Sequence, residues 1–147
     1  MMKNAVFSLL VILFAISCNT QKVYSDFDIS YSKSGGSVPT YENLLIKGNN
    51  AHYSFEGPDN KTKQNFKITA DEVNHLNQTL TDNQFRNILE DRKKLYDHVA
   101  TSISVKTGAN TGSKTDASLI MPQYKGNWEN ITKAFQEIIN KNIKNTK

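Results

Sequence analysis

Cysteine is nearly absent from this sequence, because Cys18 is the only one among 147 residues. One cysteine cannot form a disulfide within the chain. There is no Gly-x-Ser-x-Gly motif to mark an activated serine. The only histidines are His52, His75 and His98, each more than twenty residues from the next, whereas zinc sites gather their ligands at short spacings. The sequence therefore predicts no catalytic residue, no metal site and no cofactor-binding residue.

Long apolar runs are missing too, with one exception at the N-terminus. Ala5 to Ile16 is almost wholly apolar, follows the basic Lys3 and ends at Ser17 and Cys18. This run is too short to span a bilayer, which requires about 20 apolar residues. A basic start, a short apolar stretch and a small residue at its end are typical of a secretory signal peptide. We therefore expect the segment to direct export.

The end of this segment, Phe14-Ala15-Ile16-Ser17-Cys18, resembles the bacterial lipobox. Ser17 and Cys18 match that motif, and Ala15 stands where leucine is usual. The resemblance implies that residues 1–17 are a removed signal peptide and that Cys18 carries a lipid on its sulfur. Alternative interpretations are an ordinary signal peptide with an incidental cysteine, a transmembrane helix and a buried N-terminal segment.

A lipid on Cys18 would place the protein in the bacterial cell envelope, with the membrane as a partner. Two or three acyl chains hold a protein firmly, since each buried methylene contributes about 0.8 kcal/mol. Asn19 is not the aspartate that retains enterobacterial lipoproteins in the inner membrane, which favours the outer membrane. Residues 18–25 are polar and would form a tether that reaches about 25 Å at most.

The remaining residues, 26–147, have the length of a single domain. The chain carries a formal net charge of +4. Its lysines are scattered, and export separates the protein from most nucleic acid. We therefore expect no nucleic-acid partner.

Alternation of apolar and polar side chains predicts about six strands in this domain. They lie near residues 27–31, 41–46, 51–55, 64–68, 101–105 and 117–121. Gly48-Asn49-Asn50 is typical of a tight turn, so 41–55 is predicted to be a β-hairpin.

Two helices are predicted from capping residues and helical periodicity. Thr69 and Glu72 match a capping box, and Thr81 to Gln84 repeats that pattern before a shorter helical piece. Asn127 is the expected N-cap of a last helix. The apolar stripe of that helix comprises Ile131, Ala134, Phe135, Ile138 and Ile139. The predicted fold is α+β, a mostly antiparallel sheet in the order ββββ-α-ββ-α with both helices on one face.

Four features of this layout stand at recognisable positions. They are Gly35-Gly36, the hairpin 41–55, the capped helix at Thr69-Glu72, and Asp97 before the strand at 101–105. In these respects the body resembles small exported bacterial domains of unknown function. That resemblance implies no particular activity.

Candidate chemistry is sparse. Asp97 and His98 are the first place to look for a general base, but neighbours in a strand point to opposite faces. We favour a turn aspartate and a surface histidine. Asp26 and Asp28 are too few for a calcium loop.

The aromatic residues of the first four strands suggest a core face beneath the helices. The alternative is an exposed sheet face that serves as a binding platform. Tyr24 and Tyr124 are expected at the surface, and Trp128 is expected to anchor the core. The strand aromatics are Phe27, Tyr31, Tyr41, Tyr53, Phe55 and Phe66.

These patterns together predict a lipid-anchored envelope protein whose domain is a non-enzymatic binding module for another envelope protein. One alternative is a small hydrolase built on His98 or His52 with a nearby acid. Another is a small-ligand carrier, which would require an apolar cavity.

Overall fold

The computed structural model describes residues 26–93 and 95–143. The predicted signal peptide (1–17), the lipid attachment at Cys18 and the tether (18–25) lie outside the described residues. Among the described residues, no helix is both long and apolar enough to cross a membrane.

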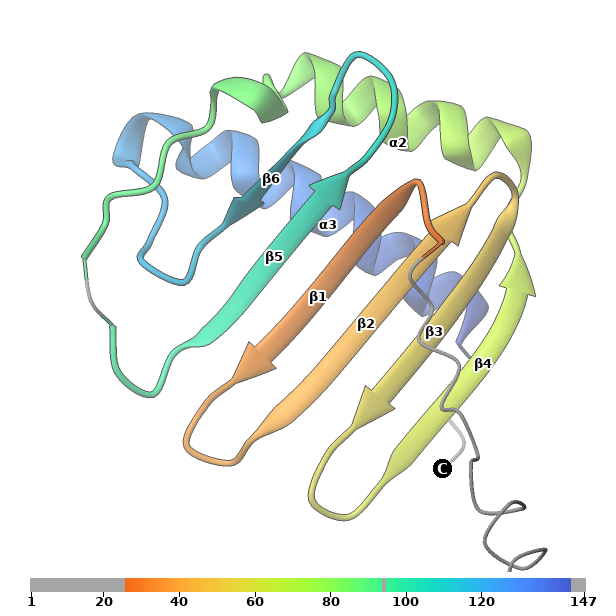
Figure 1. The fold of residues 1–147 in the computed structure, drawn as a ribbon, viewed down its shortest axis with the longest axis horizontal. Helices are drawn as coiled ribbons and strands as arrows, with labels where there is room; N and C mark the ends of the chain where they lie inside the picture. The colour runs from red at the N-terminus through yellow and green to blue at the C-terminus, as the bar shows by residue number, and fades with distance from the viewer. Residues whose placement is uncertain (1–25, 94, 144–147) are drawn as a thin grey trace, which may run out of the picture.

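The described residues form one antiparallel sheet of six strands (Figure 1). The strands are β1 (Ile29–Gly35), β2 (Thr40–Lys47), β3 (Asn50–Glu56), β4 (Lys61–Lys67), β5 (Val99–Val105) and β6 (Gly112–Thr115). Their order across the sheet is β4-β3-β2-β1-β5-β6. Three hairpins join the first four strands, and β5 returns to pair with β1. The predicted α+β class and the order of strands and helices are confirmed.

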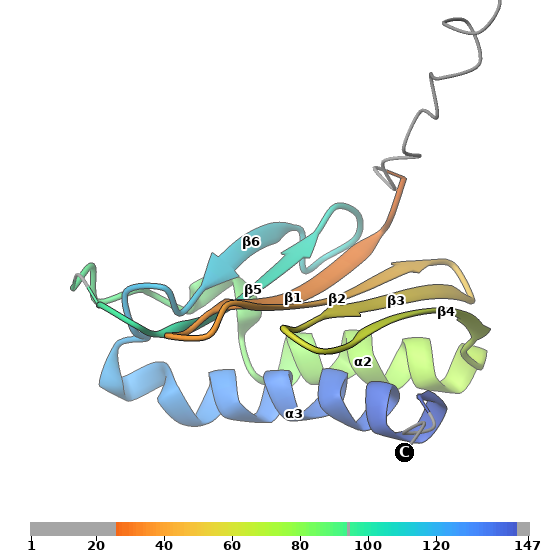
Figure 2. The ribbon, with the colours of Figure 1, turned by 90° about the horizontal axis from the view of Figure 1, so that it is seen from below.

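Two helices, α2 (Ala70–Asp82) and α3 (Lys125–Asn142), cover the same face of the sheet (Figure 2). The predicted capping box starts α2, because the Thr69 hydroxyl accepts from the Glu72 N–H at 3.1 Å. The Glu72 carboxylate accepts in return from the Thr69 N–H at 2.7 Å. Two short 3₁₀ helices, η1 (Phe85–Asn87) and η2 (Pro122–Tyr124), complete the set.

The core lies between the sheet and the helices. Tyr31 stacks on Phe135 of α3, with ring centroids 5.0 Å apart, and both side chains are fully buried. Each such side chain contributes about 1.5–3 kcal/mol through burial. The predicted stripe of α3 is buried, and Trp128, as expected, is only 5% exposed.

Some of the strand aromatics lie in the core and others are exposed. Tyr31 and Tyr53 are buried, and Phe55 and Phe66 pack against the core from its edge, as the core interpretation predicted. Tyr124 also packs against the core, so its predicted surface position is wrong. Tyr41 is 58% exposed.

The opposite face of the sheet is covered by neither described helix, and it is polar. Serines face one another across its central strands, Ser30 opposite Ser104 and Ser32 opposite Ser102. Hydroxyl groups therefore line the centre of this face, and Tyr41 is the strand aromatic that the register places on it.

Two predicted helix starts are wrong. Thr81 lies inside α2 and donates its hydroxyl to the Asn77 carbonyl, so it caps nothing. Gln84 enters η1 with a positive φ of 50° and no side-chain cap. Helix α3 begins at Lys125 rather than after Asn127, because Pro122 has already started a 3₁₀ turn that runs into it. Asn127 instead donates to the Asn83 carbonyl, which joins the two helices.

The sixth strand was predicted in the wrong place. It comprises Gly112–Thr115, a polar segment, and not residues 117–121. Pairing with β5 determines its position, and Leu119 adopts a φ of +68° that no strand accommodates. Only Ile120 of the predicted segment is bridged, to Glu90.

Candidate functional site

The two ends of the sheet differ in what they expose. One end, which we call the proximal end, holds Asp26, the β2–β3 turn at Gly48 and the β5–β6 turn. Helix α2 lies along this end (Figure 1). Asn110 in the β5–β6 turn donates to the Asn77 carbonyl of α2 at 3.1 Å. The distal end holds the β1–β2 turn, the start of β5 and the loop from β6 to α3. Because β1 runs from one end to the other, Asp26 and the β1–β2 turn lie at opposite ends (Figure 1).

Exposed apolar side chains gather at the distal end. Among the residues that the structure describes, six large apolar side chains are 40–76% accessible. Five of them lie in the distal loops or at the strand ends beside them, and the sixth, Leu89, lies one loop away. The five are Val38, Tyr41, Tyr96, Val99 and Leu119. We call these five residues the distal apolar cluster.

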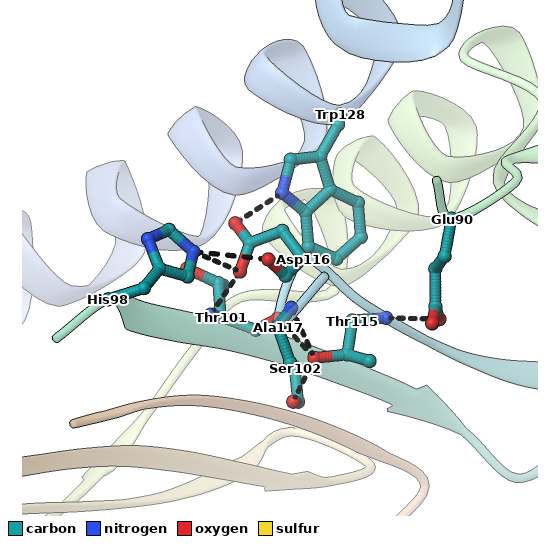
Figure 3. Close-up of polar contacts among 8 residues, drawn as sticks. All are labelled: Glu90, His98, Thr101, Ser102, Thr115, Asp116, Ala117 and Trp128. Atoms are coloured by element: carbon teal, nitrogen blue, oxygen red, sulfur yellow. Dashed lines mark hydrogen bonds and ion pairs between the residues drawn. The ribbon is translucent and has the colours of Figure 1, made fainter. Parts of the chain in front are cut away.

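Asp116 is the centre of the polar contacts at this end (Figure 3). One carboxylate oxygen accepts from the Thr101 N–H at 2.5 Å, and the other accepts from the Trp128 indole N–H at 2.9 Å. Its backbone N–H donates to the Thr101 carbonyl, and its own carbonyl accepts from the Leu119 N–H. Asp116 therefore ties β5, the β6–α3 loop and α3 together.

His98 lies beside Asp116 and not beside its sequence neighbour. Its Nε2 is 3.0 Å from the Asp116 carbonyl oxygen and 3.6 Å from the nearer carboxylate oxygen. Because a carbonyl only accepts, Nε2 carries the proton in this contact. Asp97 sits in the preceding turn with a φ of +54°. Asp97 therefore lies in a turn, as favoured from the sequence, and the carboxylate beside the partly buried His98 is that of Asp116.

The hydroxyls of four residues that a nucleophilic site could use, Ser102, Thr115, Tyr31 and Tyr53, form hydrogen bonds with groups other than His98. The hydroxyls of Ser102 and Thr115, which bond to each other at 2.9 Å, lie on the opposite face of the sheet. Tyr31 and Tyr53 lie on the helix face, but burial raises the pKa of both phenols, so they stay protonated near neutral pH.

A groove of about 550 Å³ runs beside this centre. One wall is a stripe of α3, whose members recur at helical spacing over three turns. The other wall consists of Lys33 from β1, His98, Thr101 and the loop residues Leu119 and Ile120. The residues of the α3 wall are Lys125, Trp128, Glu129, Thr132, Lys133 and Gln136. We call this feature the Asp116 groove.

Hydrogen bonds from the uncharged amide of Gln136 fix the end of the groove at that residue. The Gln136 amide donates to the Tyr31 hydroxyl at 2.8 Å and to Glu42 at 3.2 Å. Tyr53 donates to the other Glu42 oxygen at 3.0 Å. These bonds hold Gln136 against the sheet, so that the groove keeps its shape there.

The other predicted candidates lie apart from the groove. His52 contacts Asn65 on the polar sheet face, and His75 is exposed on α2. The three histidines do not converge. Within residues 26–93 and 95–143, no group of three or more His, Cys, Asp or Glu is placed to hold a metal ion.

Asp26 and Asp28 lie at the proximal end, beside the β2–β3 turn. Both carboxylates contact the Lys47 ammonium group, at 3.0 and 3.1 Å. The Gly48 N–H, followed by Lys47, holds the pKa of Asp28 below its usual value. Their role in the structure is to fix the β2–β3 turn.

Asp116, Lys33 and Gln136 were not singled out by the sequence. Asp116 follows a polar strand that the alternation pattern missed, so nothing marked it as a strand end. Lys33 and Gln136 look like ordinary surface residues until the register places them on either side of one groove. No protein-family model matches the chain, and no curated protein matches it.

Proposed function

We propose that this chain is a lipid-anchored protein of the bacterial cell envelope whose domain is a non-enzymatic binding module for another envelope protein. The observation that carries the proposal is the distal apolar cluster. Single exposed apolar residues are ordinary, whereas contiguous exposed apolar surface is typical of an interaction site, and we propose that these five side chains provide one at the distal end. The Asp116 groove opens beside the same end and extends this surface.

The anchor is proposed at Cys18, on the strength of the lipobox resemblance. The cluster faces away from Asp26, where the tether would enter the domain 26–147. A tether of eight residues would keep the proximal end near the membrane, which we propose is the outer membrane, and would present the distal end to a partner. Labelled palmitate should enter the wild type and not Cys18→Ala. Equal label in both, or none in either, would refute the anchor.

A small hydrolase is the second candidate, and one observation favours it: His98 lies beside a carboxylate. Both Asp116 oxygens, however, already accept hydrogen bonds that hold the fold together, and the Ser102 and Thr115 hydroxyls lie on the opposite face of the sheet. We therefore place this function second. If His98→Gln abolished the cellular phenotype while partner capture stayed intact, the hydrolase would replace the binding module.

The binding module can be tested by quantitative capture from crosslinked cells. The double variant Val38→Asp/Tyr41→Asp places two charges in the distal apolar cluster. A matched control, Asn49→Asp/Thr107→Asp, adds the same charge to exposed positions at the proximal end. We expect the first variant to lose an envelope protein that the wild type and the control both retain, with equal thermal melts. Equal recovery from all three would refute a distal binding surface.

A further inference from the structure

We infer that the Asp116 groove binds an extended acidic segment of the partner protein, with carboxylates four residues apart and an apolar side chain between them. This inference rests on the proposed binding function and names the chemistry of its partner. It follows from the length of the groove, its charge and its apolar wall.

The length suits an extended peptide. The α3 wall runs from Lys125 to Gln136, a separation of eleven positions that spans about 16 Å at the helical rise. An extended chain of five residues covers about the same distance. The lining of the groove includes Leu119, which belongs to the distal apolar cluster. A segment lying in it would remain continuous with a protein seated on that cluster.

Three lysines, Lys33, Lys125 and Lys133, line the groove against two carboxylates, Asp116 and Glu129, so the formal charge of its lining is +1 with His98 neutral. Lys125 and Lys133 are both about three-quarters exposed. Each is held only by a glutamate one turn along α3, at 3.8 and 3.9 Å. Exposed ion pairs of this kind contribute little free energy, so a ligand carboxylate can replace the glutamate at a small cost in binding free energy.

Lys33 adds a third cation from the opposite wall. Its ammonium group lies 5.8 Å from the Tyr31 ring centroid, and among the described residues it forms no ion pair. The Asp116 and Glu129 carboxylates reduce this positive charge, and both Asp116 oxygens already accept hydrogen bonds, from Thr101 and Trp128. A carboxylate entering the groove therefore has lysine donors on both walls.

The spacing of the lysines selects the pattern of the ligand. Lys125 and Lys133 are eight residues apart on one helix face, about 12 Å along its axis. In an extended chain, side chains four residues apart point the same way and lie about 13 Å apart. A side chain midway between them would reach Leu119 and Ile120.

Binding can be measured with the full lipidated chain in detergent and a fluorescein-labelled peptide, Glu-Ser-Leu-Ser-Glu. Trp128 supplies a second signal, because it is the only tryptophan in the chain and lies in the groove wall. We expect saturable anisotropy with a parallel change in tryptophan emission. The double variant Lys125→Gln/Lys133→Gln should weaken binding about tenfold.

The control variant Lys61→Gln/Lys63→Gln removes the same charge from the edge strand β4 and should change the affinity less than twofold. Equal weakening by both variants would reduce the effect to general charge attraction. Binding of Gln-Ser-Leu-Ser-Gln with equal affinity would refute recognition of carboxylates. Displacement by free glutamate at the same concentration as the peptide would identify a small-anion site instead. If no peptide binds while Val38→Asp/Tyr41→Asp still abolishes capture, the acidic segment is refuted and the binding module stands.

Discussion

The two ends of the sheet each hold an aspartate, but in different ways. At the proximal end, Asp28 is 29% exposed and is held by a turn N–H and a lysine that water readily replaces. At the distal end, Asp116 is 18% exposed and accepts from Thr101 and from the buried Trp128. The distal end, which exposes apolar side chains, is thus the end where an aspartate is held by hydrogen bonds from within the domain. Such hydrogen bonds fix the shape of a surface whose exposed side chains have no other part of the domain packed over them.

The largest expected effect comes from removing these two carboxylates in turn. Asp116→Ala leaves the Thr101 and Trp128 donors without acceptors and should lower the free energy of unfolding by about 3 kcal/mol. Asp28→Ala exposes its former partners to water and should lower it by about 1 kcal/mol. Urea denaturation of both variants measures the contrast. Equal losses would show that the distal network has no special role.

A pair of glycines sharpens the same comparison. Gly35 has a φ of +112°, and a Cβ there would lie 2.5 Å from the His98 carbonyl oxygen. Gly48 at the proximal end has a φ of +54° and open space around it. We expect Gly35→Ala to cost about 2 kcal/mol or more, since strain and a backbone clash combine, and Gly48→Ala about 1 kcal/mol. Thermal melts of the two variants test this order, which would be refuted if Gly48→Ala proved the more damaging.

The smallest effect concerns α2, which lies along the proximal end. Lys141, followed by the Thr69 N–H, holds the pKa of Glu72 below its usual value. A lowered folded-state pKa adds stability that is present above the unfolded value and is lost as the pH falls through the folded one. Glu72→Gln should therefore cost about 1 kcal/mol at pH 7.

The cost of Glu72→Gln should shrink as the pH falls below the ordinary glutamate pKa of about 4.3 and through the lowered folded-state pKa, where the wild-type carboxylate becomes protonated as well. Urea denaturation at pH 7 and at pH 3.5 measures both values. A constant difference between the wild type and the variant at the two pH values would contradict the assignment.

Local patterns were enough to predict most of the fold. The alternation around Leu44 and Tyr53, with Gly48 between them, predicted the β2–β3 hairpin because turn chemistry and periodicity agree there. The Thr69 capping box and the α3 stripe were equally direct. In each case the signal lies within about a dozen residues, where sequence spacing determines which side chains meet.

The site was beyond such patterns because it depends on tertiary pairing. Gly112–Thr115 has no apolar alternation, and it becomes a strand only because β5 offers it hydrogen bonds. Asp116 acquires its role from that pairing, since Trp128 and Thr101 reach it from elements that the sequence does not connect. The likeness of Thr81–Gln84 to a capping box was misleading for the converse reason: α2 continues through Thr81 because Leu80 is buried in the core.

The central claim is that a partner binds the distal end, and site-specific photocrosslinking in living cells tests it most directly. Benzoylphenylalanine in place of Tyr41 probes the distal apolar cluster, and the same residue in place of Asn49 probes the proximal end. The account predicts one discrete protein adduct from position 41 and none from position 49. An adduct from position 49 alone, or none from position 41, would contradict it.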